Sequence, residues 1–216
     1  MTVPSFIYET PYWQEGKMRV VGVDEVGRGC LAGPVVAAAV IMPANGAPIE
    51  GVRDSKQLSP RQRLRLFGLI QQQAIAIGVG VASVAEIDQV NILQATYRAM
   101  TRALGRVAPW DQALIDGKLT KTAPFERGMA IVGGDRYCYS IACASIVAKV
   151  RRDRFMVRLS RRYPAYGWER NVGYGTPEHR RALAQNGLTP WHRRSFLKSY
   201  GEQTPFLPSP EGAPCC

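Results

Sequence analysis

Four carboxylates in this sequence stand where strands are expected to end, a setting in which carboxylates often bind metal ions. Asp24 and Glu25 follow the apolar run 18–23 and directly precede a glycine turn. Asp116 closes another short apolar run, and Asp135 follows a Gly-Gly pair. A carboxylate at the end of a buried strand is costly unless it is paired or bound to a cation. Three such positions in one sheet therefore predict a shared acidic cluster.

An acidic cluster of this kind indicates metal-dependent chemistry. Neighbouring carboxylates raise one another's pKa unless cations neutralise them. Their hard oxygen atoms favour Mg²⁺ or Mn²⁺ as ligands. Two such ions about 4 Å apart can activate a water molecule and stabilise the leaving 3′ oxygen of a phosphodiester. The residue types therefore predict two-metal phosphodiester hydrolysis.

Each acid also has a structural alternative, which is to cap a turn or to pair with an arginine. Two further acids are weaker candidates for the cluster. Asp54 can orient Ser55 and Lys56, which follow it, and Asp153 lies among arginines with which it can pair.

The basic residues are concentrated late in the chain. The 216-residue chain has a formal net charge of +11. Residues 145–200 contain 13 Lys/Arg and 3 Asp/Glu, whereas the rest of the chain contains 15 Lys/Arg and 14 Asp/Glu. A surface charged only for solubility would not separate charges in this way, so the segment predicts a nucleic-acid face. An anionic membrane surface is the minor alternative, and no wide apolar helix face supports it.

The cysteines and the apolar runs indicate a cytoplasmic protein. The five cysteines are odd in number and contain no metal-type CxxC pair, which fits reduced thiols. The first residues lack the pattern of a secretory signal. No apolar run approaches the roughly 20 residues that span a bilayer, so no membrane association is expected.

Hydrophobic periodicity and capping residues predict an α/β fold. Strands are expected at 18–23, 34–42, 74–82, 113–116 and 130–132. Helices are expected to start at Ser59-Pro60 and to lie near 84–105, 140–162 and 177–186. Capping boxes at Ser59 and Ser83 mark the first two helix starts, and Thr176 caps the last. Strands that alternate with helices favour one mixed sheet, with the first two strands antiparallel across the glycine turn. The expected organisation is an N-terminal arm (1–17), one domain (18–200) and a disordered proline-rich tail (201–216).

Several ordered blocks resemble the signature of the type 2 ribonuclease H family, and the bacterial form, ribonuclease HII, is the closest match. The resemblance covers roughly residues 18–197 and includes the blocks Val23–Gly29, Leu31–Val40, Asp54–Leu58, Ile115–Gly117, Gly134–Asp135, Ala144–Asp153, Tyr163–Pro164, Gly173–His179 and Thr189–Phe196. It implies a ribonuclease H-like fold, with a mixed five-stranded sheet flanked by helices and a small C-terminal helical extension from about residue 165.

The resemblance also implies an activity and its metal ligands. The family cleaves RNA–DNA hybrids and duplex DNA with single embedded ribonucleotides. It cuts on the 5′ side of the ribonucleotide and leaves 3′-hydroxyl and 5′-phosphate ends. Its metal-binding carboxylates map onto Asp24, Glu25, Asp116 and Asp135.

Two elements match the family's means of recognising a ribonucleotide. The turn Gly27-Arg28-Gly29 matches the element that reads the ribose 2′-hydroxyl through its backbone. Glycine permits such close approach, and the hydroxyl can both donate and accept a hydrogen bond. Tyr174 matches the tyrosine that packs on the sugar at the junction. Without the resemblance, these residues would be a plain tight turn and a surface aromatic.

Basic residues supply the expected phosphate contacts. Lys56 and Lys149 match family lysines on backbone phosphates. Arg151, Arg154, Arg158 and Arg161 follow at helical spacings and suit phosphate tracking, although a solvated helix face is the alternative. His179 and His192 are expected to have structural roles.

Two other functions compete with this prediction. A resolvase-type nuclease of the ribonuclease H-like superfamily would share the acids but would have no 2′-hydroxyl to read. A non-catalytic hybrid-binding protein would gain from having fewer carboxylates near phosphate. The sequence indicates no obligate protein partner, and a monomer is expected.

Overall fold

The computed structural model describes residues 3–44 and 46–197. The chain forms two compact units. The first consists of Met1–Val26, Val36–Val81 and Thr96–Arg151, and the second of Gly27–Val35, Ala82–Ala95 and Arg152–Cys216. The expected tail, 201–216, lies outside the described residues.

A mixed five-stranded sheet forms the centre of the first unit. Its strands are β1 (Val20–Val26), β2 (Val35–Ile41), β3 (Ala76–Ala82), β4 (Gln112–Asp116) and β5 (Gly128–Ile131), in the order β3-β2-β1-β4-β5. β1 pairs antiparallel with β2 and parallel with β4, which in turn pairs parallel with β5. The predicted mixed sheet and antiparallel first pair are confirmed. β1 and β2 are apolar almost throughout because the sheet is covered on both faces.

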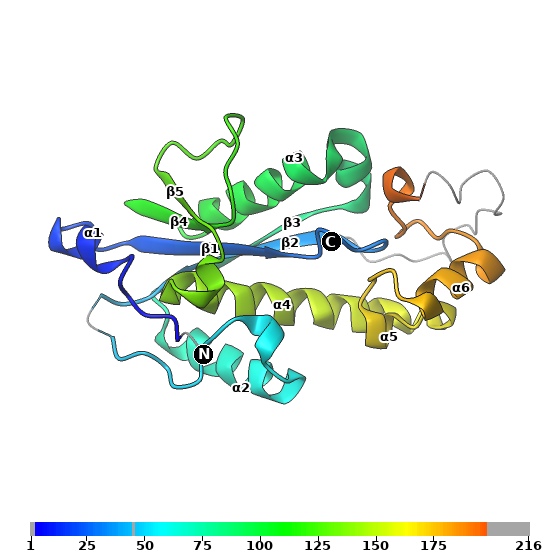
Figure 1. The fold of residues 1–216 in the computed structure, drawn as a ribbon, viewed down its shortest axis with the longest axis horizontal. Helices are drawn as coiled ribbons and strands as arrows, with labels where there is room; N and C mark the ends of the chain where they lie inside the picture. The colour runs from blue at the N-terminus through cyan, green and yellow to red at the C-terminus, as the bar shows by residue number, and fades with distance from the viewer. Residues whose placement is uncertain (1–2, 45, 198–216) are drawn as a thin grey trace. The chain divides into compact units, whose positions relative to one another are not determined.

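Helices cover the sheet on both sides (Figure 1). On one face, α2 (Pro60–Gln73) and the first part of α4 (Tyr139–Ser160) pack with β2 around Val40, Phe67 and Val147. On the other, residues 96–105 of α3 (Val84–Gly105) approach β3 closely. A Cβ at Gly80 would lie 1.9 Å from the Ala99 carbonyl oxygen, so only glycine permits this approach.

Both predicted capping boxes are present. The Ser59 hydroxyl accepts a hydrogen bond from the Gln62 amide at 3.3 Å, and the Gln62 side chain accepts one from the Ser59 amide at 2.9 Å. Ser83 and Glu86 form the equivalent pair at 3.2 and 3.0 Å. These bonds satisfy amide groups that the first helical turn leaves without partners.

The helix expected at 84–105 is interrupted at Asn91, whose φ is 68° and ψ is 166°. The Asn91 side chain accepts hydrogen bonds from the amides of Leu93 and Gln94, at 3.0 and 3.1 Å, and so caps the continuing helix. Asparagine tolerates positive φ and is a good N-cap, which explains a break that the apolar periodicity conceals.

The N-terminal arm contains the short helix α1 (Thr10–Gln14) and is part of the first unit. Tyr8, Tyr12 and Trp13 cover an apolar cluster that includes Val20 and Leu114. Glu9 is buried, and its carboxylate accepts hydrogen bonds from the amide and the hydroxyl of Ser140 at 2.8 and 2.7 Å. Burial raises the pKa of Glu9, and the Ser140 hydrogen bonds oppose that rise.

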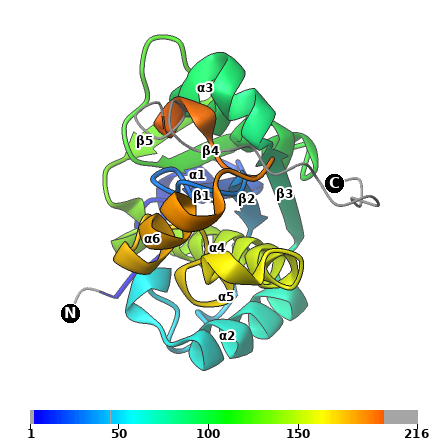
Figure 2. The same ribbon diagram turned by 90° about the vertical axis from the view of Figure 1, so that its right-hand side faces the viewer.

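The second unit has its own apolar core. It includes residues 152–160 of α4, α5 (Trp168–Asn171) and α6 (Pro177–Asn186), seen close together in Figure 2. Their core contains Met156, Tyr166, Trp168 and Leu183. The Thr176 hydroxyl caps α6 by accepting from the His179 amide at 3.2 Å, as the sequence predicts.

Candidate active site

The four predicted acids all lie in the first unit, at or just beyond strand ends. Asp24 and Glu25 are on β1, and Asp116 is the last residue of β4. Because Val23 pairs with Ile115 in parallel register, the acids that follow emerge at the same edge of the sheet. Asp135 lies in the 3-10 turn η2 (Gly134–Arg136), after β5.

Hydrogen bonds tie these acids to the backbone. Asp116 accepts from the Gly134 amide at 2.7 Å, which links the end of β4 to the turn that carries Asp135. A Cβ at Gly134 would lie 2.6 Å from the end of the Ile141 side chain, which would have to move to make room for it. Asp24 accepts from the Glu25 amide, also at 2.7 Å.

The four carboxylates repel one another, and two of them are buried. Asp24 and Asp135 are only 5% and 4% exposed. The pKa of Asp24 is raised well above its usual value, first by burial and then by the charges of Glu25 and Asp116, with a smaller contribution from Asp135. Burial, Asp54 and Asp116 raise the pKa of Asp135, whereas Lys56 lowers it. The four acids therefore share one electrostatic environment, which a cation would stabilise.

Within the described ranges, no three or more His, Cys, Asp and Glu side chains are grouped so that they could hold a metal ion by themselves. The acids nevertheless have the donor atoms that a divalent metal ion prefers. Buried carboxylates that destabilise one another are the oxygen donors that hard divalent ions prefer, and Mg²⁺ commonly completes its shell with water and substrate phosphate.

The 3-10 turn η1 (Ser55–Gln57) brings a lysine to these acids. Asp54 caps the turn by accepting from the Lys56 amide at 2.9 Å, and its carboxyl group is close enough to Asp135 to raise the pKa of that acid. The Lys56 ammonium lies 3.6 Å from the Asp135 carboxylate and remains largely exposed. Asp54 therefore orients Lys56, as expected, and contacts the acidic cluster as well.

Two serines that the sequence reasoning did not assign support the cluster. The hydroxyls of Ser55 and Ser145 are 2.9 Å apart and buried. Ser145, on α4, also hydrogen-bonds with Asp24 and thereby lowers its pKa against the effect of burial. Serines within an apolar helix have no distinctive spacing, so only the family block Ala144–Asp153 drew attention to this region.

The Ser145→Ala variant is expected to weaken metal binding by about tenfold, because groups that hydrogen-bond a ligating carboxylate fix its orientation. Calorimetric titration with Mn²⁺ measures this change without relying on activity. Ser160→Ala is the matched control, because the Ser160 hydroxyl donates to Val157 within the same helix. Equal Mn²⁺ affinity in all three proteins would show that Ser145 does not position Asp24.

In the second unit, two buried arginines hold the turn that contains Gly27-Arg28-Gly29. The Arg193 guanidinium donates to the carbonyls of Gly27 at 2.6 Å, Arg28 at 2.8 Å and Gly33 at 2.8 and 3.0 Å. Arg152 donates to the carbonyls of Ala32, Pro34 and Val172 at 3.0, 2.9 and 2.8 Å. Burial lowers the pKa of Arg193 to about 10, so it stays protonated at neutral pH.

The glycines of this turn have different constraints. Gly27 has a φ of +94°, and a Cβ there would lie 2.1 Å from the Arg152 side chain. A Cβ at Gly29 would meet nothing within 4 Å. Gly27 is therefore required by conformation and packing, whereas Gly29 leaves space beside the backbone.

Tyr174 belongs to the same hydrogen-bonded assembly in the second unit. The Leu31 amide donates to the Gly173 carbonyl at 2.8 Å. A Cβ at Gly173 would lie 2.5 Å from the Ala32 carbonyl oxygen, so the two loops are in close backbone contact. Tyr174 is 39% exposed.

The remaining basic residues divide into exposed and buried groups. Lys149 is half-buried on α4, one helical turn after Ser145. Arg151, Arg154, Arg158 and Arg161 are exposed, and Arg151 lies 5.2 Å from the centre of the Phe67 ring. The prediction that segment 145–200 forms a nucleic-acid face is wrong for Arg152 and Arg193, because both are fully buried.

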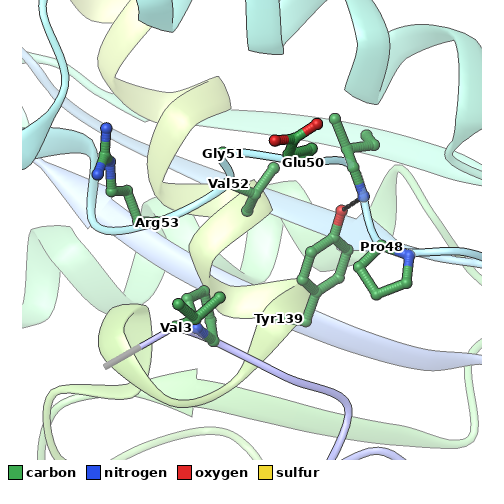
Figure 3. A pocket seen from close by; sticks show the side chains of 9 residues that line it. Val3, Pro48, Glu50, Gly51, Val52, Arg53 and Tyr139 are labelled. Carbon is green, nitrogen blue, oxygen red and sulfur yellow. Dashed lines mark hydrogen bonds between the residues drawn. The ribbon is translucent and has the colours of Figure 1, made fainter. Parts of the chain in front are cut away.

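A separate pocket lies in the first unit, with a volume of about 280 Å³ (Figure 3). Its wall includes Val3, Pro48, Val52 and Tyr139, and the Tyr139 hydroxyl accepts from the Ile49 amide at 2.5 Å. Its lining shares no residue with the acidic cluster.

Solved structures with this fold identify the class of protein. The structure of ribonuclease H2 from Pyrococcus horikoshii OT3 matches with a TM-score of 0.72 and 28% identity, over 86% of this chain and 98% of that one. Bst-RNase HIII in complex with Mn²⁺ matches in fold, with a TM-score of 0.58 and 23% identity, over 78% of this chain and 61% of that one. The sheet and its strand-end acids therefore define a nuclease of the ribonuclease H type.

Sequence relatives narrow this class to one family. The family model described as Ribonuclease HII matches residues 21–199. The ribonuclease HII of Thermosynechococcus vestitus is 81% identical over 195 residues, which cover 90% of this chain and 91% of the relative. The chain belongs to the ribonuclease HII family, and so is a metal-dependent endonuclease that acts on RNA–DNA substrates.

None of the helices in the described ranges is long and apolar enough to cross a membrane.

Proposed function

We propose that this chain hydrolyses the RNA strand of RNA–DNA hybrids and nicks duplex DNA on the 5′ side of a single ribonucleotide. The products are 3′-hydroxyl and 5′-phosphate ends. The observation that carries the proposal is the mutually repelling set Asp24, Glu25, Asp116 and Asp135 near the strand ends, in which Asp24 and Asp135 are buried. A protein that only bound the hybrid would gain nothing from concentrating negative charge there.

Asp24, Glu25, Asp116 and Asp135 would hold two Mg²⁺ or Mn²⁺ ions. When bound, such ions supply activation of water and stabilisation of the leaving 3′ oxygen. The structure of Bst-RNase HIII, which shares the fold, was solved in complex with Mn²⁺ and supports the choice of a divalent ion. The chain's own contribution is to fix the carboxylates, through the Gly134 amide on Asp116 and Ser145 on Asp24.

Recognition of the ribonucleotide is assigned to the second unit. Arg193 donates hydrogen bonds to the carbonyl oxygens of Gly27 and Arg28 and thereby fixes the backbone of the turn. Backbone groups of Gly27, Arg28 and Gly29 then read the 2′-hydroxyl, and Tyr174 packs on the adjacent sugar. Lys56 and Lys149 bind backbone phosphates.

We further propose that the protein acts as a monomer in the cytoplasm without an obligate protein partner. Its basic segment, 145–200, supports nucleic acid as the principal partner. Analytical ultracentrifugation of the free protein and of its complex with a hybrid measures the oligomeric state, and we expect one protein chain in each.

A labelled DNA duplex with one embedded ribonucleotide tests the proposed reaction. In Mg²⁺ or Mn²⁺, we expect a single nick 5′ to the ribonucleotide, and no cleavage of the all-DNA duplex or in EDTA. End analysis should give a 3′-hydroxyl and a 5′-phosphate. Cleavage of the all-DNA duplex would instead favour a resolvase-type nuclease, and binding without cleavage would favour a binding module.

A further inference from the structure

Two buried histidines in the second unit form a connected network beside Tyr174. The Nε2 atoms of His179 and His192 are 3.1 Å apart, and the Trp168 indole nitrogen is also 3.1 Å from His179 Nε2. His179 Nδ1 lies 2.9 Å from the Tyr174 carbonyl oxygen. Both histidines are at most 1% exposed.

The indole determines which nitrogen of His179 carries the proton. An indole N–H can only donate, so His179 Nε2 must accept from Trp168. A neutral His179 therefore has its proton on Nδ1, where it faces the Tyr174 carbonyl and donates to it. This assignment follows from the hydrogen-bond chemistry of one fixed donor.

His192 leads independently to the same assignment. The Thr189 amide donates to His192 Nδ1 at 3.0 Å, so that nitrogen is an acceptor. The proton of neutral His192 is then on Nε2 and points at His179 Nε2. The N–H groups of Trp168 and His192 thus both point at His179 Nε2, and a proton on that nitrogen would be repelled by both. Burial lowers the pKa of both rings, that of His192 to about 3, in keeping with a neutral pair.

The hydrogen bond from His179 Nδ1 to the Tyr174 carbonyl links α6 to the loop that contains Tyr174. The Tyr174 carbonyl also accepts from the Thr176 amide at 2.8 Å, and Thr176 in turn caps α6 at the His179 amide. The loop and the first turn of α6 therefore form a closed set of hydrogen bonds. Tyr174, which is partly exposed, is attached to this fixed backbone.

We infer that His179 is a positioning residue for Tyr174, with its tautomer fixed by Trp168 and His192. The inference rests on the proposed role of Tyr174 in packing on the sugar. A fixed carbonyl holds the Tyr174 backbone, so the aromatic ring meets the ribonucleotide without the cost of ordering a mobile loop.

The tautomers can be measured without any substrate. The chain has two histidines, so ¹⁵N labelling of the imidazoles gives spectra of two rings only. At pH 7 we expect both rings to be neutral, with His179 protonated on Nδ1 and His192 on Nε2. A His179 ring that is protonated on Nε2, or charged, would overturn the inference.

Two substitutions separate the roles of the His179 nitrogens. His179→Asn retains a donor near the position of Nδ1, whereas His179→Gln retains a polar group near Nε2 and loses that donor. On the single-ribonucleotide duplex, the Gln variant is expected to lose about tenfold in kcat/KM and the Asn variant no more than about threefold. Tyr166→Phe is the matched control, since it removes buried hydrogen bonds to Asn186 and Gly187 in the same aromatic cluster.

Combining these substitutions with Tyr174→Ala distinguishes positioning from general stability. In the Tyr174→Ala background, His179→Gln is expected to change kcat/KM by less than about twofold, because the positioned ring is gone. An equal loss in both backgrounds contradicts the inference. If Tyr174→Ala is impaired but His179→Gln is not, only the inference fails. If Tyr174→Ala cleaves normally, the proposed role of Tyr174 fails too.

Discussion

The Asp24→Asn variant is expected to lose cleavage by about a thousandfold or more while it still binds an RNA–DNA hybrid. Asp24 is the most buried of the β1 acids and feels the charges of Glu25, Asp116 and Asp135. An amide at this position keeps the shape but removes the negative charge on which a divalent ion depends. Binding should persist because Lys56 and Lys149, which we propose to bind phosphates, are unchanged, and because fewer carboxylates repel the substrate less.

The same substitution is expected to stabilise the metal-free protein. A carboxyl whose pKa is raised in the folded state favours folding when protonated and opposes it once ionised. At any pH above the unfolded pKa, the raised pKa of Asp24 therefore costs stability, and stability of the metal-free chain should increase as pH falls toward the unfolded pKa. Asn removes this cost, so thermal unfolding in EDTA should shift to higher temperature.

Cleavage, hybrid binding and unfolding should be measured on Asp24→Asn beside Asp153→Asn. Asp153 lies on α4 among arginines and serves as the control acid. Wild-type cleavage by Asp24→Asn would exclude the proposed site. Loss of cleavage together with a lower unfolding temperature in EDTA would show a folding defect and leave the electrostatic account unsupported.

The acids could be predicted from the sequence because their signal is local. Asp24 and Glu25 directly follow an apolar run and lie in the last three residues of β1, and Asp116 ends β4. The alternation of strands and helices already indicates a mixed sheet. Parallel pairing of β1 with β4 then brings the strand ends together. Capping boxes at Ser59 and Ser83 were equally visible, since both partners lie within four residues.

Long-range polar partnerships were not visible in the sequence. Ser55 and Ser145 are ninety residues apart, and nothing in either neighbourhood indicates that their hydroxyls meet. Arg152 and Arg193 looked like members of a basic surface, because a guanidinium that binds buried carbonyls has no local signature. The break at Asn91 was hidden by an apolar pattern that continues across it.

The second large effect is expected at Arg193. Arg193→Met should lower the free energy of unfolding by about 3–5 kcal/mol, because it leaves several buried carbonyls without donors. The lost bonds are those to Gly27, Arg28 and Gly33. Since these carbonyls hold the turn assigned to the 2′-hydroxyl, discrimination between ribonucleotide-containing and all-DNA duplexes should fall together with stability.

Denaturant unfolding and the ratio of cleavage rates on the two duplexes measure these effects, with Arg194→Met as the matched control. Arg194 carries the same charge, is the next residue and is exposed, so its loss tests the simple removal of one positive charge. Arg193→Lys should be intermediate, because one ammonium cannot reproduce a planar guanidinium that serves three carbonyls. A stable Arg193→Met chain with normal discrimination would show that the turn keeps its shape without this arginine. Reduced stability with normal discrimination between the two duplexes would show that Arg193 contributes to folding only. Recognition of the 2′-hydroxyl would then depend on the backbone geometry around Gly27 and not on Arg193.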